Sequence, residues 1–340
     1  VDTEFTVSKA NPNMTVGVTT GDYGTKANVT VTLNNNATGS VTITVSGKGS
    51  QTVAIVDGKA TWSISDLAEG SHTVTVTYDG DGNFTATSLT TEFSSGNGDA
   101  SLSVVVGNVT YGNNATVVVS TNGKATGTVT INVNGIEQTK TLVNGKATFI
   151  VSGLAAGTYT ITATYSGDAN FTGSSGDAEF TVSKISAGMN VVAGNVAYGA
   201  NGTVIVTVNP EATGKVTINV NGVDHEVDIV DGKAVYAAVN LPAGKYAVTV
   251  TYKGDANFTG TTINTEFIVN KADAGLNVIV SNITYGNNAT VIATVNNKAT
   301  GSVTINVNGN DYTATIINGK ATFNVPDLAA GDYTVAIKYG

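Results

Sequence analysis

The sequence contains no cysteine and no arginine, and only one tryptophan, two histidines and four prolines among its 340 residues. Without cysteine, neither disulfides nor thiolate metal sites can hold the chain together. The 16 lysines are scattered and are outnumbered by 25 acidic residues, so the net charge is −9 at pH 7. Nucleic acids and anionic membrane surfaces call for basic clusters. We therefore expect no nucleic acid as a partner and no direct membrane insertion, and we find no transmembrane or signal segment.

The chain also lacks the side chains of a catalytic site. Catalysis by proton transfer or by a nucleophile needs a poised acid, base or nucleophile with a partner close by. His72 and His225 stand at different places in the pattern described below, and neither has such a partner nearby in the sequence. The sequence therefore predicts a protein that is not an enzyme, with no catalytic residue and no cofactor, calcium being the one candidate.

What the chain has in abundance is a long internal repeat. The tripeptide Gly-Lys-Ala begins at Gly58, Gly145, Gly232 and Gly319, which are spaced by 87 residues. Solenoid repeats are usually about 20 to 50 residues long, so a period of this length indicates whole domains in tandem. Apolar residues make up 41% of the chain and charged residues 12%, and there are 40 glycines. This composition is typical of short strands joined by tight turns.

Within one period, alternating residues predict a β-sandwich. Residues 215–220 alternate polar and apolar side chains, as in a strand with one face in the core. Asn221-Gly222 follows, which is a strong hairpin signal. Seven such segments with regularly spaced turns indicate an Ig-like sandwich, and no segment has helical periodicity. We predict an all-β fold of tandem, seven-stranded, Ig-like β-sandwiches in a linear rod.

The repeat also predicts the domain boundaries. Repeat 1 covers residues 10–95, repeat 2 residues 96–183, repeat 3 residues 184–270 and repeat 4 residues 271–340. Residues 1–9 have the pattern of an orphan last strand, whereas repeat 4 lacks its last strand. The joint at Ser94–Asp99 contains two glycines and little strand pattern, which predicts the most flexible joint.

The repeated segments resemble the bacterial Ig-like domains that form tandem arrays in bacterial and archaeal surface adhesins, including the adhesin-like proteins of methanogenic archaea. The likeness covers almost the whole chain and is carried in repeat 2 by Tyr111-Gly112, Ala125–Thr130, Asn144–Ala147, Leu154–Gly157 and Tyr165–Phe171. It implies an extracellular protein of the cell surface that serves as a stalk or adhesin and has no catalytic residues. It also implies a tyrosine corner at Tyr159, Tyr246 and Tyr333, with a looser corner in repeat 1, where His72 takes this place.

The two ends of the sequence suggest a way of assembling. Residues Glu4–Lys9 match Glu179–Lys184 of repeat 2 residue for residue. We predict a donor strand at Glu4, Phe5, Thr6 and Val7 of one copy, and an acceptor edge in repeat 4 of the next at Tyr333, Val335, Ile337 and Tyr339. Two alternatives stay open, namely that the strand comes from later residues of a longer array and that the chain has been shortened.

The turn at Asp79, Asp81 and Asn83 is a weak calcium candidate, because oxygen-bearing side chains occupy alternate positions. The alternative is a turn in which Asp and Asn bond to their own backbone. Candidate N-glycosylation sequons lie at Asn83, Asn170 and Asn257 in one shared turn, and at Asn114 and Asn288.

Together these observations favour a structural stalk or filament of the cell surface that serves adhesion, over a module that binds a ligand itself. The predicted partners are other copies of the chain or flanking Ig-like repeats, and a host-cell or other microbial surface. The alternative is an adhesin module that binds a ligand or glycan. Repeat 1 would hold that site because it differs most from the others, with Trp62 and His72.

Overall fold

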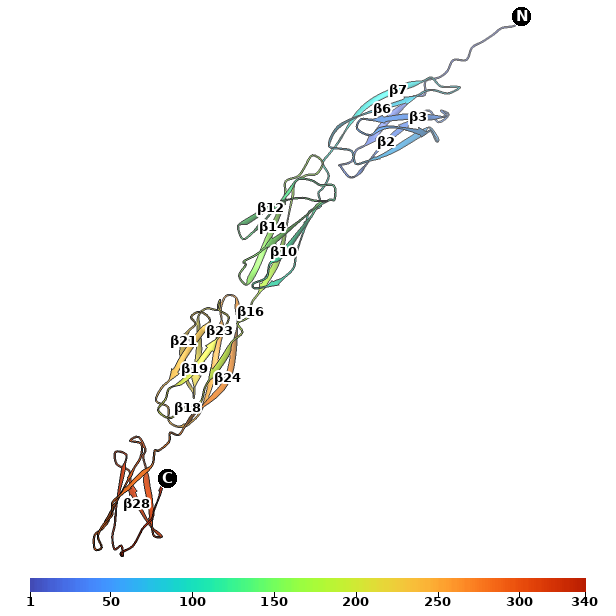
Figure 1. Ribbon diagram of the computed structural model, residues 1–340. Helices are drawn as coiled ribbons and strands as arrows, with labels where there is room; N and C mark the ends of the chain where they lie inside the picture. Colours follow the sequence, from blue (N-terminus) through green and yellow to red (C-terminus); the bar gives the residue numbers. More distant parts are fainter. The chain divides into compact units, whose positions relative to one another are not determined.

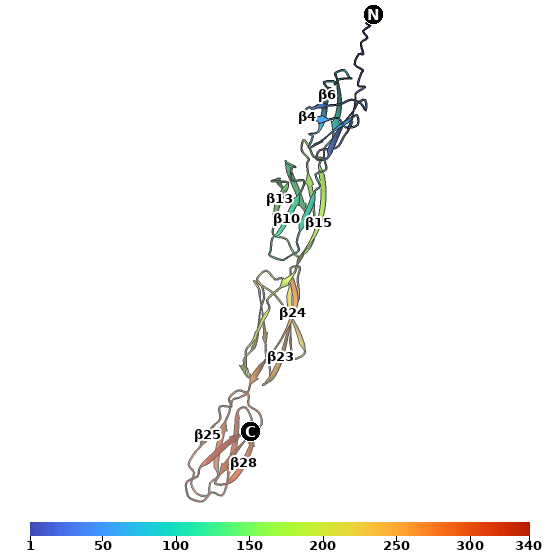
Figure 2. The ribbon, with the colours of Figure 1, turned by 90° about the vertical axis from the view of Figure 1, so that its right-hand side faces the viewer.

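The computed structural model describes residues 1–340 and consists of β-strands and turns without a helix (Figure 1). The chain forms two compact halves, Val1–Ile185 and Ser186–Gly340. Each half contains two β-sandwiches, which correspond to repeats 1 and 2 and to repeats 3 and 4 (Figure 2). The predicted all-β fold of tandem Ig-like sandwiches is therefore confirmed.

In the first half, each sandwich packs a three-stranded sheet against a larger one. Repeat 1 has the sheet orders β1-β2-β5 and β4-β3-β6-β7, and repeat 2 has β13-β10-β8 and β12-β11-β14-β15-β9. The strands of repeat 1 are β1 (Thr15–Thr19), β2 (Lys26–Thr32), β3 (Ser40–Val45), β4 (Gly49–Ala54), β5 (Lys59–Ser65), β6 (Gly70–Tyr78) and β7 (Thr87–Ser95). Those of repeat 2 are β8 (Ser103–Val106), β9 (Val109–Thr110), β10 (Ala115–Ser120), β11 (Thr128–Val133), β12 (Ile136–Thr141), β13 (Lys146–Val151), β14 (Gly157–Tyr165) and β15 (Ser174–Ser183).

The second half begins just after the start of β16 (Ile185–Ser186) and follows the same plan, except that both sheets of repeat 4 have three strands. Repeat 3 has β17-β19-β22 against β24-β23-β20-β21, and repeat 4 has β25-β26-β29 against β28-β27-β30. The strands of repeat 3 are β17 (Asn190–Ala193), β18 (Val196–Ala197), β19 (Gly202–Thr207), β20 (Lys215–Val220), β21 (Val223–Asp228), β22 (Lys233–Ala238), β23 (Gly244–Gly254) and β24 (Phe258–Asn270). Those of repeat 4 are β25 (Asn277–Val280), β26 (Ala289–Thr294), β27 (Ser302–Val307), β28 (Asn310–Thr315), β29 (Lys320–Val325) and β30 (Val335–Tyr339).

The alternating pattern places every second side chain in a core. Val129, Ile131 and Val133 of β11 are buried, and they pack with Phe149 of the opposite sheet. Asn134 and Gly135 join β11 to β12 with φ angles of 54° and 85°. Positive φ at both central residues is the requirement of the type I′ turn, which Asn-Gly adopts at little cost. Burial of the alternate apolar side chains then fixes the register of the strands.

One strand of repeat 4 is shorter than we predicted. The predicted acceptor edge began at Tyr333, but β30 begins at Val335, so Tyr333 lies outside the strand. The reason is visible in repeat 2, where β11 pairs only with residues 161–165 of β14, and residues 157–160 pair with β15 alone. Residues 331–334 stand at the same place in repeat 4, where β30 pairs only with β27.

Candidate functional site

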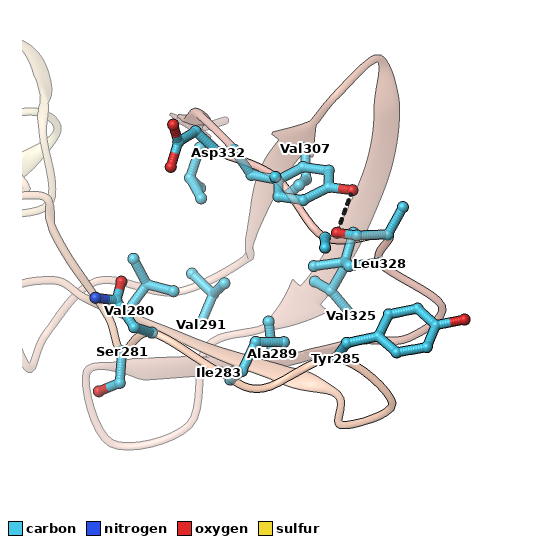
Figure 3. A pocket seen from close by; sticks show the side chains of 16 residues that line it. Val280, Ser281, Ile283, Tyr285, Ala289, Val291, Val307, Val325, Leu328 and Asp332 are labelled. Carbon is cyan, nitrogen blue, oxygen red and sulfur yellow. Dashed lines mark hydrogen bonds between the residues drawn. The ribbon is translucent and has the colours of Figure 1, made fainter.

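A groove opens between the two sheets of repeat 4 (Figure 3). It has a volume of about 410 Å³ and lies beside the start of β30. Val307 and Val325 come from opposite sheets and face the same space, with Ala289 below them in the view. The lining combines polar and apolar atoms: Ser281, Asn282 and Asp332 lie beside the apolar side chains of Val280, Ile283, Ala289, Val291, Val307, Val325, Leu328 and Val335. Apolar side chains of another strand can pack against the apolar part of this lining.

In repeats 2 and 3 the corresponding place is filled by the last strand. Phe180 of β15 is 1% exposed, and its ring stacks on Tyr159 with 5.6 Å between centroids. Phe267 of β24 stacks on Tyr246 in the same way at 5.4 Å. Tyr333 occupies the place of these tyrosines in repeat 4 and lines the groove. The groove therefore has the position of the last-strand phenylalanine and its neighbours.

The structure brings the predicted acceptor residues together along this edge. Tyr333, Val335, Ile337 and Tyr339 are half-buried and pack on the core of repeat 4. On β14, by contrast, Ile161 and Ala163 are fully buried, because β15 covers that edge. The backbone edge of β30 that faces away from β27 has no strand against it. Such an edge is a template for another strand.

The predicted donor residues have no regular structure. Residues 1–9 form no strand, and Phe5 and Val7 are exposed by 88% and 82%. Their exposure contrasts with the burial of Phe180 and Val182, which occupy the same places in the pattern of repeat 2. The donor and acceptor residues belong to different halves of the chain, and their pairing stays a prediction.

The tyrosine corner is present in three repeats and has a substitute in the first. The hydroxyl of Tyr159 donates a hydrogen bond of 3.0 Å to the carbonyl oxygen of Ala155, and Tyr246 and Tyr333 do the same at 2.9 and 3.0 Å. In repeat 1, Nε2 of His72 lies 2.8 Å from the carbonyl oxygen of Ala68, at the same spacing of four residues. We expected a looser corner here, but the histidine has the equivalent partner.

The turn that carried the calcium hypothesis is held by hydrogen bonds to one aspartate. Oδ2 of Asp81 accepts bonds from the N–H and hydroxyl of Thr38 at 2.8 and 2.9 Å. Its Oδ1 accepts bonds from the backbone N–H groups of Asn83 and Phe84 at 2.7 and 2.8 Å. We call this arrangement the aspartate clamp. It recurs at Asp168 with Thr126 and at Asp255 with Thr213.

These bonds set the protonation state of the clamp. Bonds from the N–H groups of Asn83 and Thr38 are the main cause that lowers the pKa of Asp81 below its usual value. At Asp168, burial raises the pKa, but the hydrogen bonds from Thr126, Asn170 and Phe171 outweigh it and hold the pKa at about 2. Burial, followed by the neighbouring Asp168 carboxylate, raises the pKa of Tyr165 to about 12. The carboxylates therefore stay ionised as hydrogen-bond acceptors.

Calcium would compete with these bonds for the oxygens of Asp81. Asp79 and Asn83 are exposed on the same turn, and the structure shows no group of three or more His, Asp and Glu side chains that could hold a metal. The geometry supports the alternative of a turn that bonds to its own backbone. Calcium binding at Asp79, Asp81 and Asn83 is the less favoured alternative, and titration with calcium can test it.

The candidate glycosylation residues all lie outside the strands, and Asn83, Asn170 and Asn257 lie in bends. Asn83, Asn114 and Asn288 are exposed, and Asn170 and Asn257 are half-buried. Trp62, one of the residues that set repeat 1 apart, is half-buried and packs on the core of repeat 1. Trp62 thus has the packing of a core residue.

A family of protein domains accounts for this architecture. The profile described as bacterial Ig-like domain (group 3) matches residues 14–95, 97–183 and 189–270, which is more than half of the chain. The chain belongs to this family. Domains of this family are typically found in extracellular or surface-associated proteins and typically have no catalytic role. No helix of this bacterial Ig-like chain is long and apolar enough to cross a membrane.

No curated protein matches the chain, but many solved structures do. The ICAM-5 D1–D4 ectodomain fragment is 11% identical, with 96% of this chain and 98% of that one covered and a TM-score of 0.36. The FN1–FN3 domains of chicken CNTN1 are 10% identical, with 78% and 100% covered and a TM-score of 0.24. The fibronectin(III)-like modules of Clostridium thermocellum CbhA are 16% identical, with 50% and 95% covered and a TM-score of 0.23. Such low identities indicate nothing about function.

Two features of these bacterial Ig-like repeats were missed in the sequence. The aspartate clamp joins residues that are 42 or 43 positions apart, such as Thr126 and Asp168. The recurrence of an Ala-Thr-Gly turn 42 or 43 positions before each Asp-x-Asn-Phe turn was the available signal. The second feature is a set of contacts between repeats 1 and 2, which involves Tyr23 and Asp66.

Proposed function

We propose that this chain is a non-enzymatic structural stalk of the cell surface, in which bacterial Ig-like domains act as spacers. The observation that carries the proposal is the repeated use of the same polar residues for structure. Asp81, Asp168 and Asp255 form the same clamp in three repeats, and a binding site would set one repeat apart from the others. The family's usual occurrence in surface-associated proteins supports the location.

The location is tested on intact cells of the source organism. An antibody raised against the 340-residue chain should label unpermeabilised cells, and external protease should remove that label. A cytosolic protein of the same cells is the control for leakage. Label that appears only after permeabilisation would overturn the surface proposal.

We further propose that repeat 4 is completed by strand addition, which would turn the stalk into a filament serving adhesion. The supporting observation is the fit between the groove and the segment Glu4–Lys9. The groove lies where Phe180 and Val182 lie in repeat 2, and Phe5 and Val7 stand at the same places in a matching sequence. A strand from a second copy would add backbone hydrogen bonds to β30 and bury its two apolar side chains.

Light scattering across a concentration series tests the assembly. The chain should form head-to-tail polymers, and either Phe5→Ala or deletion of Val1–Lys9 should leave it monomeric. The matched control carries Gly167–Ser183 of repeat 2 after Gly340, because this segment supplies a last strand within the chain and should also prevent assembly. Equal assembly of all four proteins, or a monomeric full chain at high concentration, would refute the donor strand.

A further inference from the structure

The first half of the chain contains a built contact between repeats 1 and 2. The ring of Tyr23, from repeat 1, meets Phe171 of repeat 2 edge-on, with 5.1 Å between centroids. Tyr23 is half-buried and packs on the core cluster of repeat 2. Its backbone N–H donates a bond of 2.8 Å to the carbonyl oxygen of Gly96 in the joint. Two repeats therefore share one aromatic side chain.

An ion pair lies at the same joint. Nζ of Lys124, in repeat 2, is 2.6 Å from Oδ1 of Asp66, in repeat 1. Asp66 follows β5 in a left-handed conformation with a φ of 55°. The hydrogen bond from Lys124 lowers the pKa of Asp66 and raises that of Lys124. Both side chains are partly exposed, so the pair contributes little free energy.

The residues that make this contact differ between the four repeats. The place of Asp66 is taken by Gly153, Asn240 and Asp327, with φ angles of 71°, 55° and 57°. The place of Lys124 is taken by Glu211 and Lys298, and the place of Tyr23 by a tyrosine in every repeat. Asp327 therefore has the same conformation and the same charge as Asp66. Repeat 4 alone repeats the combination of tyrosine and aspartate found in repeat 1, at Tyr285 and Asp327.

In repeat 4 these two residues face solvent. Tyr285 is 78% exposed, whereas Tyr23 is half-buried under repeat 2. Asp327 is also exposed and has no ion pair. In repeat 1 the residues at these two places, Tyr23 and Asp66, both contact repeat 2.

We propose that Tyr285 and Asp327 form a docking surface for a further bacterial Ig-like domain of the repeat 2 type. The partner domain carries a lysine at the place of Lys124 and a phenylalanine at the place of Phe171. Charge selects this type, since Glu211 of repeat 3 would face Asp327 with the same sign, and Asn36 of repeat 1 is uncharged. The proposal rests on the tandem architecture and is independent of the cellular location. It requires a last strand in repeat 4, because Tyr285 lines the groove that this strand would fill, but it does not depend on which segment supplies the strand.

The chain offers a matched pair of proteins for the test. One protein carries Gly80–Ser183 after Gly340, which supplies a last strand for repeat 4 and then a second copy of repeat 2. The control carries Gly167–Asn270 after Gly340, which supplies a last strand and then a copy of repeat 3. Because the chain has no cysteine, two introduced cysteines can be spin-labelled without further changes. Asn310→Cys is combined with Glu137→Cys in the added repeat 2, or with Asp224→Cys in the added repeat 3, since all three residues are exposed.

Electron paramagnetic resonance then measures the distance distribution across the new joint. With the added repeat 2 we expect a narrow distribution that Asp327→Asn, Tyr285→Ala or high salt broadens. With the added repeat 3 we expect a broader distribution that Asp327→Asn leaves unchanged or narrows. Distributions of equal width in all variants would overturn the proposal.

A second measurement is made across the existing joint between repeats 1 and 2, with labels at Lys48→Cys and Glu137→Cys in the original chain. Lys124→Glu should broaden this distribution, and an unchanged width would also overturn the proposal.

Discussion

Oδ2 of Asp168 accepts two hydrogen bonds from Thr126, one from its backbone N–H at 2.7 Å and one from its hydroxyl at 2.8 Å. These bonds connect the turn after β14 to the turn before β11, which lie 42 positions apart in the sequence. The same carboxylate caps the N–H groups of Asn170 and Phe171 in its own turn. One side chain thus satisfies four donors at the end of the sandwich. Hydrogen bonds to a charged acceptor are stronger than those between neutral groups.

The first prediction is that this clamp stabilises its own repeat. Asp168→Ala should lower the free energy of unfolding of repeat 2 by about 2 to 4 kcal/mol, because hydrogen bonds to charged groups contribute about 1.5 to 3 kcal/mol each and are not additive. Thr126→Val removes only the hydroxyl and should cost about 1 kcal/mol. Urea unfolding measures both effects. The control is Asp177→Asn, because the side chain of Asp177 on β15 is exposed, and this change should have almost no effect on stability. Equal losses of stability for Asp168→Ala and Asp177→Asn would contradict the prediction.

The second prediction is a loss of stability in acid. The pKa of Asp168 is held at about 2 in the folded chain, against an ordinary value of 3.8. The unfolded chain therefore binds a proton at a higher pH than the folded one. The contribution of the clamp is complete above about pH 4 and is lost as the pH falls toward 2. Asp81 and Asp255, whose pKa values are also lowered, add to the effect.

Thermal unfolding between pH 2 and pH 7 checks this dependence. The melting temperature of repeat 2 should fall between pH 4 and pH 2 in the original chain. Asp168→Asn should be less stable at pH 7 and should show a smaller fall. If the melting temperature of this variant fell as much between pH 4 and pH 2 as that of the original chain, groups other than Asp168 would cause the acid sensitivity.

The core could be predicted from the sequence because its signals are local. Alternation over residues 215–220 predicted that Val216 and Ile218 lie inside, and Asn221-Gly222 predicted the hairpin that follows them. The 87-residue period extends both predictions to the other repeats. Each of these predictions needed only neighbouring residues and the 87-residue period.

Contacts between distant turns could not be predicted in this way. Thr126 and Asp168 both have the ordinary composition of turns, so nothing local indicates that they bond to each other. Gly98 looked like a source of flexibility, but any side chain there would collide with the carbonyl oxygen of Tyr23. The late start of β30 was missed because the pattern of repeat 4 continues through Tyr333 although the pairing does not.

The third prediction concerns calcium. Both carboxylate oxygens of Asp81 already accept bonds from Thr38, Asn83 and Phe84, so a calcium ion would have to displace these donors. We expect the melting temperature of repeat 1 to be the same with millimolar calcium and with a chelator. Isothermal titration with calcium should show no saturable heat. A rise in melting temperature that Asp79→Asn abolishes would instead establish calcium binding at this turn.

The last prediction is that each core stabilises its own repeat. Phe149 is completely buried among residues of repeat 2, and apart from Tyr23 no residue of another repeat joins that cluster. Phe149→Ala should therefore cost about 3 to 5 kcal/mol, the usual loss when a large buried side chain is truncated. Phe323 has the same place in repeat 4 and is 4% exposed, so Phe323→Ala is the matched variant.

Hydrogen exchange followed by mass spectrometry can assign each loss to peptides of one repeat. Phe149→Ala should raise exchange in residues 96–183 and leave residues 271–340 unchanged, and Phe323→Ala should do the reverse. The same rise in all four repeats for both variants would show that the sandwiches unfold as one cooperative unit.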